Sequence, residues 1–465
     1  MKPEFKFIVL CSLLLLAFMS LPLRAQSPLQ SGFSLKDCIK YASEKNTDLK
    51  AARIDEEIAK KKVNEVAGSG LPQFDITGNL VNNLKLPAQL LPGELMGGAP
   101  GSFMAVKFGT KYNFTFTGQV TQLLFNGSFW VGLSAAKESA NYYRQNTESI
   151  SEQNIYEVAS AYYQTLVIQK QIKLLEYNLV SLEKAFQDTK LRFENGRAVE
   201  TDVDRLNVNQ NNLQYQLKKA REGLKQSYNV LKFKIGMPLE TAISLSDSMY
   251  FSQDSLVAGK IESLKYSADE EVNFQNRADY RMLQSGLTLQ ELNWKNEVSK
   301  KLPTLSAFGN YSYQAQRPQA DLFNSHKEWF NYYSIGLQVS LPIFNGGQTL
   351  ARVQQASLEI DKLKETIRKT EQGINLEMSN AIIKYNNAYD NIQSQSLNVA
   401  LARKVYNNSQ LEYREGKATA LALIDSETKL REAQTNYVNS LLDLYIARLD
   451  VEKAKGSLPA YINSL

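Results

Sequence analysis

Two uninterrupted helical stretches, 127–195 and 346–415, constrain this chain more than any other feature. Each spans about seventy residues and contains no proline. A helix of that length would extend roughly 100 Å, since each residue adds about 1.5 Å. Helices of globular proteins usually have only about three or four turns. We therefore expect two very long helices that must pack against neighbours along their length.

Apolar residues recur in both stretches at alternating intervals of three and four residues. Such heptad spacing is typical of helices that pack along their whole length. The residues that carry it are Ile155, Ala159, Tyr162, Leu166, Met378, Ile382, Tyr385, Tyr389 and Ile392. Each stretch ends in a glycine turn, at Gly196 or Gly416, and a second helix follows. The pattern predicts two antiparallel helical hairpins, with both glycines in the left-handed conformation.

Each long helix is preceded by two segments in which apolar and polar residues alternate. We expect strands at 73–80, 113–122, 304–309 and 333–340. Strands of about ten residues can cross a bilayer, and this alternation is typical where one face meets lipid and the other water. The predicted lipid-facing residues are Phe74, Ile76, Leu80, Phe114, Phe116, Val120, Leu305, Ala307, Tyr311, Tyr333, Ile335, Leu337 and Val339.

The second half of the chain repeats the first. The segment 338–346 matches 119–127 almost residue for residue, and the halves are offset by about 220 to 231 residues, which indicates a tandem duplication. Four strands cannot close a barrel, because their edges would leave backbone groups unpaired in lipid. We infer that several copies share one barrel. The competing interpretation is a small soluble four-stranded sheet beside a helical bundle.

The predicted organisation has five parts. They are a signal peptide (1–25), a first repeat (26–237), a connector (238–276), a second repeat (277–456) and a C-terminal tail (457–465). Each repeat consists of a helix, a strand pair and a long helical hairpin. In the first repeat we expect one helix over 34–67, with Ile54 and Ile58 in its apolar stripe, and a loop over 87–101 between the strands.

The N-terminus has the pattern of an export signal. Lys2 and Lys6 precede an apolar core from Phe7 to about Leu23, and Ala25 marks the predicted cleavage site. The alternative is an uncleaved anchor. Removal of the signal lowers the net charge from +5 to +3, which does not indicate nucleic-acid binding. Only Cys38 then remains, so no intrachain disulfide can form.

The order and repetition of these features resemble the TolC-type outer-membrane efflux proteins. The motifs are the Leu-Pro entry and Phe-Asn-Gly exit of each strand pair and the glycine turns at 192–196 and 413–416. The resemblance covers the mature chain. It implies a mainly α fold with a small β part, in which four strands per chain complete a twelve-stranded transmembrane β-barrel in a homotrimer. A long α-helical barrel would continue into the periplasm, and the connector would form an equatorial segment.

The resemblance also implies a location and a function. The protein would lie in the outer membrane of a Gram-negative-type cell, in contact with its lipid, as a passive channel for small molecules or secreted proteins. Its partners would be a periplasmic adaptor (membrane fusion) protein and, through it, an inner-membrane pump of RND or ABC type. The alternative function is an exported coiled-coil structural or adhesive protein with a small soluble sheet.

Nothing in the sequence predicts catalysis or a cofactor. The sole histidine, His326, lies in a predicted loop without a nearby Cys or His partner, so it is a poor metal ligand. A glycine-rich phosphate loop and a nucleophile motif are also absent from the sequence. We expect no enzyme activity.

The resemblance implies a gate and a docking surface at the two turns. Asp202 and Asp425 match acidic positions near the closed periplasmic end, where acidic rings would favour cations. The other interpretation is that they are acids stabilised by a helix N-terminus. Ala422 and Ala418 stand where the family has a second acid and a basic linking residue, so the closing network differs here. The expected adaptor-docking residues are Arg192, Phe193, Glu194, Asn195, Gly196, Arg197, Tyr413, Arg414, Glu415, Gly416 and Lys417.

Overall fold

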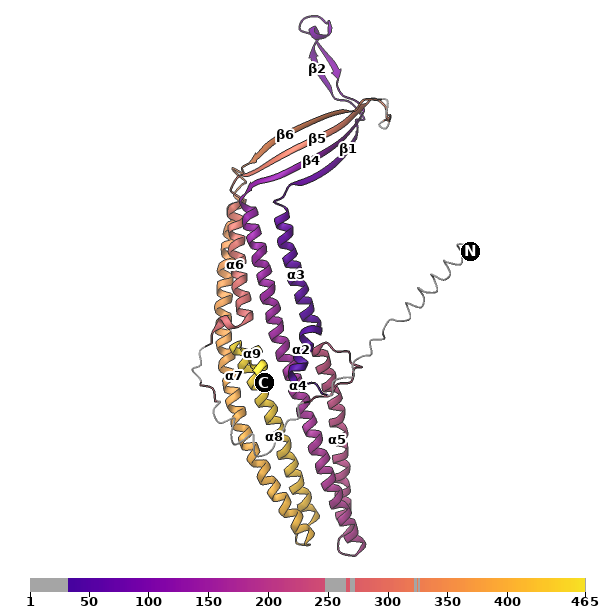
Figure 1. Cartoon of the computed structure of the whole chain (residues 1–465), viewed down its shortest axis with the longest axis vertical. Coiled ribbons are helices and arrows are strands. Elements are labelled where there is room, and N and C mark those ends of the chain that lie inside the picture. Colours follow the sequence, from indigo (N-terminus) through magenta and orange to yellow (C-terminus); the bar gives the residue numbers. More distant parts are fainter. Residues whose placement is uncertain (1–31, 247–264, 268–271, 322–323, 325–326, 465) are drawn as a thin grey trace, which may run out of the picture. The chain divides into compact units, whose positions relative to one another are not determined.

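The structure is a computed structural model that describes residues 32–246, 265–267, 272–321, 324 and 327–464 (Figure 1). The predicted signal peptide, His326 and most of the connector lie outside these ranges. The described chain is mainly helical with a four-stranded sheet, which confirms the predicted fold class. Two compact units form, Met1–Lys50 with Ser151–Val272 and Leu376–Leu465, and Ala51–Ile150 with Asn273–Asn375. Each unit combines segments from both halves of the chain.

The first unit is helical. It contains α2 (Leu35–Lys45), α5 (Glu200–Ile235), α8 (Ala420–Lys455), α9 (Leu458–Ser464) and the later parts of α4 (Gly127–Glu194) and α7 (Gln348–Arg414). The two long helices are confirmed, with 68 residues in α4 and 67 in α7. The turn glycines Gly196 and Gly416 have φ of 68° and 77°, the left-handed conformation that we predicted.

The predicted heptad residues line the core of this unit. Tyr162 of α4 is buried in a cluster that also includes Leu449 of α8. Met378 and Tyr385 of α7 are buried against Val451 of α8. Further along, towards the two turns, a cluster draws residues from α4, α5, α7 and α8 together. The heptad pattern therefore identified the faces by which these helices pack.

The predicted helix over 34–67 is instead two helices. It breaks at Asn46, between α2 and α3 (Thr47–Gly68). The Asn46 side chain accepts a hydrogen bond from the backbone N–H of Leu49 at 3.0 Å, and its amide donates to the carbonyl of Lys234 at 3.0 Å. Asn46 therefore starts α3 as a side-chain cap and also ties the break to the end of α5.

The second unit contains the sheet, with most of α3, α6 (Ala278–Ser299) and the adjoining parts of α4 and α7. The strand order is β1-β4-β5-β6, and every neighbouring pair is antiparallel. The strands are β1 (Gln73–Asn82), β4 (Tyr112–Asn126), β5 (Thr304–Arg317) and β6 (Phe330–Ser340). All four predicted strands are present, and the central pairing of β4 with β5 joins the two halves of the chain.

The Phe-Asn-Gly motif has a clear local role at the end of β4. The Asn126 side chain accepts a hydrogen bond from the backbone N–H of Phe129 at 3.3 Å. It thereby caps the first turn of α4, which begins at Gly127 directly after the strand. In the second copy, the positive φ of Gly346 and Gly347, 64° and 82°, delays the start of α7 to Gln348.

The predicted loop over 87–101 is partly ordered as a β-hairpin. Strands β2 (Ala88–Pro92) and β3 (Phe103–Lys107) pair antiparallel, and a short 3-10 helix, η1 (Gly93–Met96), lies at the tip. A further 3-10 turn, η2 (Phe274–Asn276), precedes α6. Within the described ranges, no helix combines the length and the apolar character needed to cross a membrane.

Candidate functional site

The strand register builds one continuous apolar face on the sheet. Phe74 pairs with Val120, which pairs with Gly309, and that residue pairs with Ile335. Since side chains alternate along each strand, the register places all thirteen residues predicted to face lipid on this same face. Most are exposed, with Ile335 at 89% and Tyr333 at 81%. An exposed apolar surface of this extent indicates contact with lipid or with another protein.

The opposite face of the sheet is largely polar. Thr117 of β4 and Ser312 of β5 are directly paired, and their hydroxyl oxygens lie 2.9 Å apart. Ser334 and Gln338 of β6 share this face by register. Phe308 is an apolar exception, and its ring packs over Gly336. One face thus suits an apolar environment and the other an aqueous one.

The two helical turns are tied together within one chain. Nη1 of Arg192, at the end of α4, donates to the carbonyl oxygen of Tyr413 at 2.9 Å. The hydroxyl groups of Tyr413 and Thr189 are 2.5 Å apart, and both side chains are buried. Of the eleven predicted docking residues, Tyr413 is therefore part of the core and Arg192 is half-buried. The other nine are exposed, so their surface is open to a partner.

The two predicted gate residues have different surroundings. Asp202 lies in the first turn of α5, with its side chain 21% exposed and an oxygen 3.8 Å from Arg205. Asp425 is exposed on α8, whose first turn contains no acid. Stabilisation by the helix N-terminus therefore fits Asp202 and not Asp425. Nothing in the described part of the chain joins the two carboxylates.

Several polar residues are buried at heptad positions, and these were not predicted from the sequence. The Asn178 amide of α4 donates to Gln434 of α8 at 3.0 Å, and both side chains are buried. Glu427, one heptad before Gln434, is also buried; burial raises the pKa of its carboxyl, against the opposing effects of Arg431 and Asn209. The sequence signal was there, since Glu427 and Gln434 each follow a stripe leucine by four residues. Buried polar layers of this kind can fix the register of packed helices.

A second stripe runs along α7 away from the buried heptad residues. Its apolar members are exposed and recur at multiples of seven residues; they are Leu376, Ile383, Leu397 and Leu411. On α5, Val208 and Tyr215 are similarly exposed and seven residues apart. Heptad spacing is the pattern of helix packing. These two helices therefore have a contact face that one chain leaves open.

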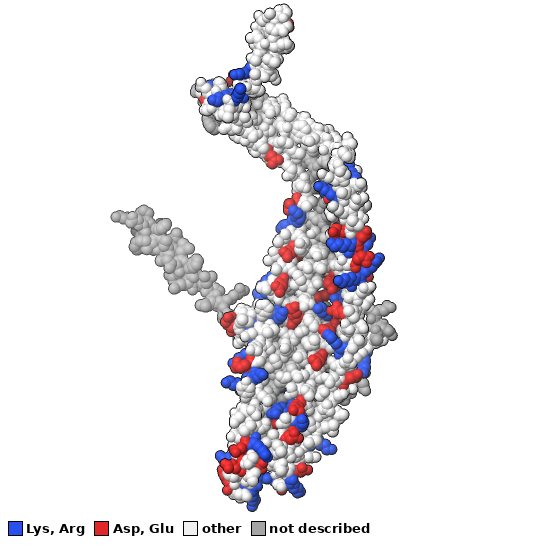
Figure 2. Space-filling model, turned by 180° about the vertical axis from the view of Figure 1, so that it is seen from behind, with Lys and Arg blue, Asp and Glu red and all other residues white. Residues whose placement is uncertain are grey.

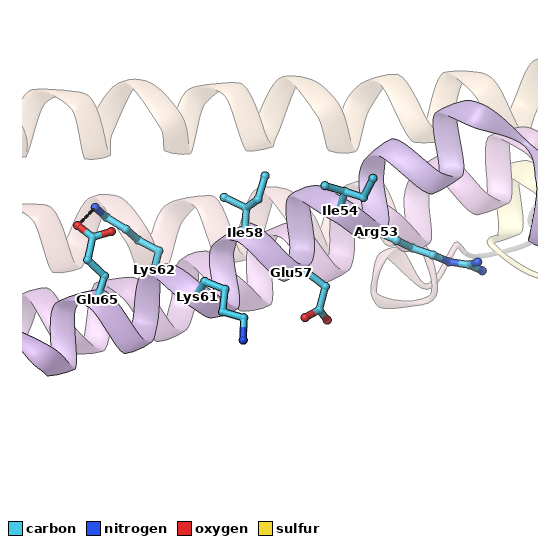
Figure 3. Close-up of a pocket in the computed structure, with 7 residues that line it drawn as sticks. All are labelled: Arg53, Ile54, Glu57, Ile58, Lys61, Lys62 and Glu65. Carbon is cyan, nitrogen blue, oxygen red and sulfur yellow. Dashed lines mark hydrogen bonds and ion pairs between the residues drawn. The ribbon is translucent and has the colours of Figure 1, made fainter. Parts of the chain in front are cut away.

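The face of α3 carries a shallow groove formed by side chains of that helix alone (Figure 3). Ile54 and Ile58, members of the predicted apolar stripe, lie in it and are 60% and 61% exposed. The buried residues of α3 are instead Leu49, Ala52 and Ala59. A Lys62–Glu65 ion pair of 2.6 Å lies at one end of the groove. The groove is therefore a charged surface around two exposed isoleucines.

The fold is that of the TolC-type outer-membrane channels. A solved structure of CusC, which forms a transmembrane channel, superposes with a TM-score of 0.71 at 16% identity, covering 92% of this chain and 95% of the other. The outer membrane protein TolC of Vibrio cholerae is 21% identical over 346 residues, 73% of this chain and 75% of the relative. TolC of Escherichia coli is 21% identical over 462 residues, 96% of this chain and 86% of the relative.

The chain belongs to the outer membrane efflux protein family, whose model matches residues 38–237 and 275–457. The protein is thus an efflux channel of the outer membrane with a periplasmic helical extension, and it is not an enzyme. This confirms the predicted family, location and absence of catalysis. The family membership also favours the channel over the coiled-coil structural protein that was the alternative.

Proposed function

We propose that three copies of this chain assemble into one conduit, with four strands from each completing a twelve-stranded barrel. The observation that carries the proposal is the sheet itself. Its apolar face is exposed, and within the described residues its edge strands β1 and β6 each pair on one side only. Unpaired strand edges are not tolerated in lipid. Pairing of β6 with β1 of the next copy would remove every edge.

The helices support the same assembly. The exposed heptad stripe of α7 and the exposed residues of α5 need a partner helix. In a closed ring of three chains, each copy would offer one of these faces to its neighbour. The helical hairpins would then form a continuous tube, bounded at its periplasmic end by the turns at Gly196 and Gly416.

The turns would bind the periplasmic adaptor, which connects the conduit to an RND or ABC pump in the inner membrane. Nine exposed residues around the two turns supply the docking surface. Asp202 and Asp425 would act as the gate, each repeated three times around the axis. Rings of carboxylates favour cations over anions, and the exposed Asp425 has no competing structural role in the described chain.

Single-channel conductance in a planar bilayer tests this proposal. We expect small, cation-selective steps from the purified protein, and larger or less selective steps from Asp202→Ala and Asp425→Ala. Asp204→Ala is the matched control, since Asp204 is exposed on α5 only two residues from Asp202. Absence of conductance from every variant, together with a monomeric protein, would refute the proposed three-chain conduit. Equal selectivity in all variants would refute the acidic gate alone.

A further inference from the structure

The end of the sheet farthest from the helices carries a basic segment that the channel function does not explain. We define the neck as residues 83–87 and 107–111, which connect the sheet to the β2–β3 hairpin. The backbone N–H of Asn83 donates to the carbonyl of Lys111 at 2.7 Å, and Ala88 pairs with Lys107. The two segments of the neck therefore run side by side, and Lys85, Lys107 and Lys111 are held in one small region.

These three lysines are available to bind an anion. All are exposed, and the neck contains no Asp or Glu. None of them makes an ion pair within the residues that the structure describes; by contrast, Lys327 in the β5–β6 connection pairs with Asp321. Figure 2 shows basic side chains where the hairpin meets the sheet, whereas the sheet surface below is nearly all uncharged.

Aromatic rings occupy the adjoining end of the apolar face. Trp329 stacks on Tyr313, with ring centres 5.0 Å apart, and meets Phe114 edge-on at 5.7 Å. Lys111 reaches back over this region, with its ammonium 5.5 Å from the centre of the Tyr112 ring. Tyr and Trp collect where apolar chains give way to headgroups, and lysines next to them extend their charge to that level. Towards the hairpin, the apolar band is followed by the aromatic rings and then by the exposed lysines. This order matches the layers of a lipid leaflet.

We propose that the neck binds the phosphate groups of a phosphorylated lipid in the outer leaflet. This rests on the proposed function, since it requires that the apolar face lies in the membrane with the hairpin outward. The helices leave from the other end of each strand, so the neck then meets the outer surface. Charge complementarity selects the ligand: lysine ammonium groups bind phosphate as point charges, and each basic residue near an anionic surface adds to attraction.

Native mass spectrometry of the detergent-purified protein tests the site, with bisphosphorylated lipid A and its fully dephosphorylated form as probes. We expect the unmodified protein to retain the phosphorylated form at least about tenfold better, and Lys85→Gln/Lys107→Gln/Lys111→Gln to lose that preference. The control is Lys61→Gln/Lys364→Gln/Lys369→Gln, which removes the same charge from exposed positions on α3 and α7. It should behave as the unmodified protein.

Two outcomes would overturn the proposal. One is an unchanged preference for phosphorylated lipid in the neck variant. The other is displacement of the lipid by millimolar inorganic phosphate, since the site would then take a free anion rather than a membrane headgroup. Conductance of the same preparation distinguishes failure of the lipid site from failure of the proposed function. A neck variant that conducts normally shows that the conduit is intact, whatever the lipid result.

Discussion

Arg192 holds the two helical turns of one chain together through Tyr413. Its Nη1 donates to the Tyr413 carbonyl oxygen at 2.9 Å, and its guanidinium lies 5.4 Å from the centre of the Tyr413 ring. α7 ends one residue later, at Arg414, and the same carbonyl also accepts a hydrogen bond from the backbone N–H of Gly416 at 3.1 Å, so Arg192 adds a second, charged donor. It also complements the negative end of the helix dipole. The contact joins the end of α4 to the end of α7.

We expect Arg192→Ala to loosen the two turns. A hydrogen bond to a charged donor is worth about 1.5–3 kcal/mol, and partial exposure of Arg192 reduces this to about 1 kcal/mol. Hydrogen–deuterium exchange over 411–418 should therefore accelerate roughly fivefold. Arg197→Ala is the control, since Arg197 is exposed in the same turn. Equal exchange in both variants would show that the Arg192 contact does not hold the turns.

Gly236, which directly follows the end of α5, should be hard to replace. It has φ of 73°, and a Cβ there would lie 2.6 Å from the carbonyl oxygen of Lys45. Gly236→Ala should destabilise the first unit by more than about 1 kcal/mol, because it combines backbone strain with a clash. Gly223→Ala, inside α5 and with open space around it, should be neutral or stabilising by about 0.5–1 kcal/mol. Thermal loss of helical circular dichroism compares the two, and equal midpoints would contradict the close approach at Lys45.

The buried carboxyl of Glu427 should make stability depend on pH. Burial raises its pKa in the folded protein above the ordinary value of 4.5, and Arg431 and Asn209 offset this only partly. The unfolded chain therefore loses this proton at a lower pH than the folded chain does. Stability consequently falls as the pH rises through 4.5 and up to the raised pKa. Glu427→Gln keeps a group that can hydrogen-bond to Asn209 but cannot ionise.

Thermal unfolding at about pH 4 and about pH 7 measures this effect. We expect Glu427→Gln to gain stability relative to the unmodified protein at the higher pH, with little difference at the lower one. Glu432→Gln is the control, because Glu432 is exposed on the same helix. A Glu427→Gln protein that is less stable at about pH 7 would show that the pairing of Glu427 with Arg431 outweighs its burial.

Periodicity made the long helices and the sheet faces predictable. Heptad spacing around Tyr385 and alternation around Ile335 are local patterns, and each reports which side of its element faces a neighbour. The break at Asn46 was not predictable in this way, because its amide is satisfied by Lys234, 188 residues away. The order of the β2–β3 hairpin likewise depends on tip contacts, such as the Glu94 carboxylate accepting from the Gly101 N–H at 2.8 Å.

The site residues divide along the same line. The sequence placed Asp202 six residues and Asp425 nine residues after their turn glycines and favoured the acidic ring more for Asp425, but it left both interpretations open. Only the helix boundaries show that Asp202 lies in a first turn and Asp425 beyond one. The contact between Arg192 and Tyr413 was also not predictable from the sequence. Arg192 donates to a backbone carbonyl, and every residue type has a backbone carbonyl. Patterns of side chains predict faces, whereas contacts to backbone need the folded chain.

Ile335 and its neighbour Ser334 distinguish a lipid-facing sheet from a soluble one. Both lie in the middle of β6, on opposite faces. An arginine in place of the 89%-exposed Ile335 would cost little in water, because the side chain would remain solvated. In a bilayer the same change should cost about 2–4 kcal/mol near the midplane.

Ile335→Arg should therefore reduce assembly into membranes, whereas Ser334→Arg should assemble and alter conductance, since its face is the aqueous one. Detergent-extracted trimer, measured by heat-modifiable migration, compares the two. If Ile335→Arg assembled normally and Ser334→Arg failed, the face of Ser334 would be the one in contact with lipid. If both variants assembled normally, the sheet would not lie in the membrane.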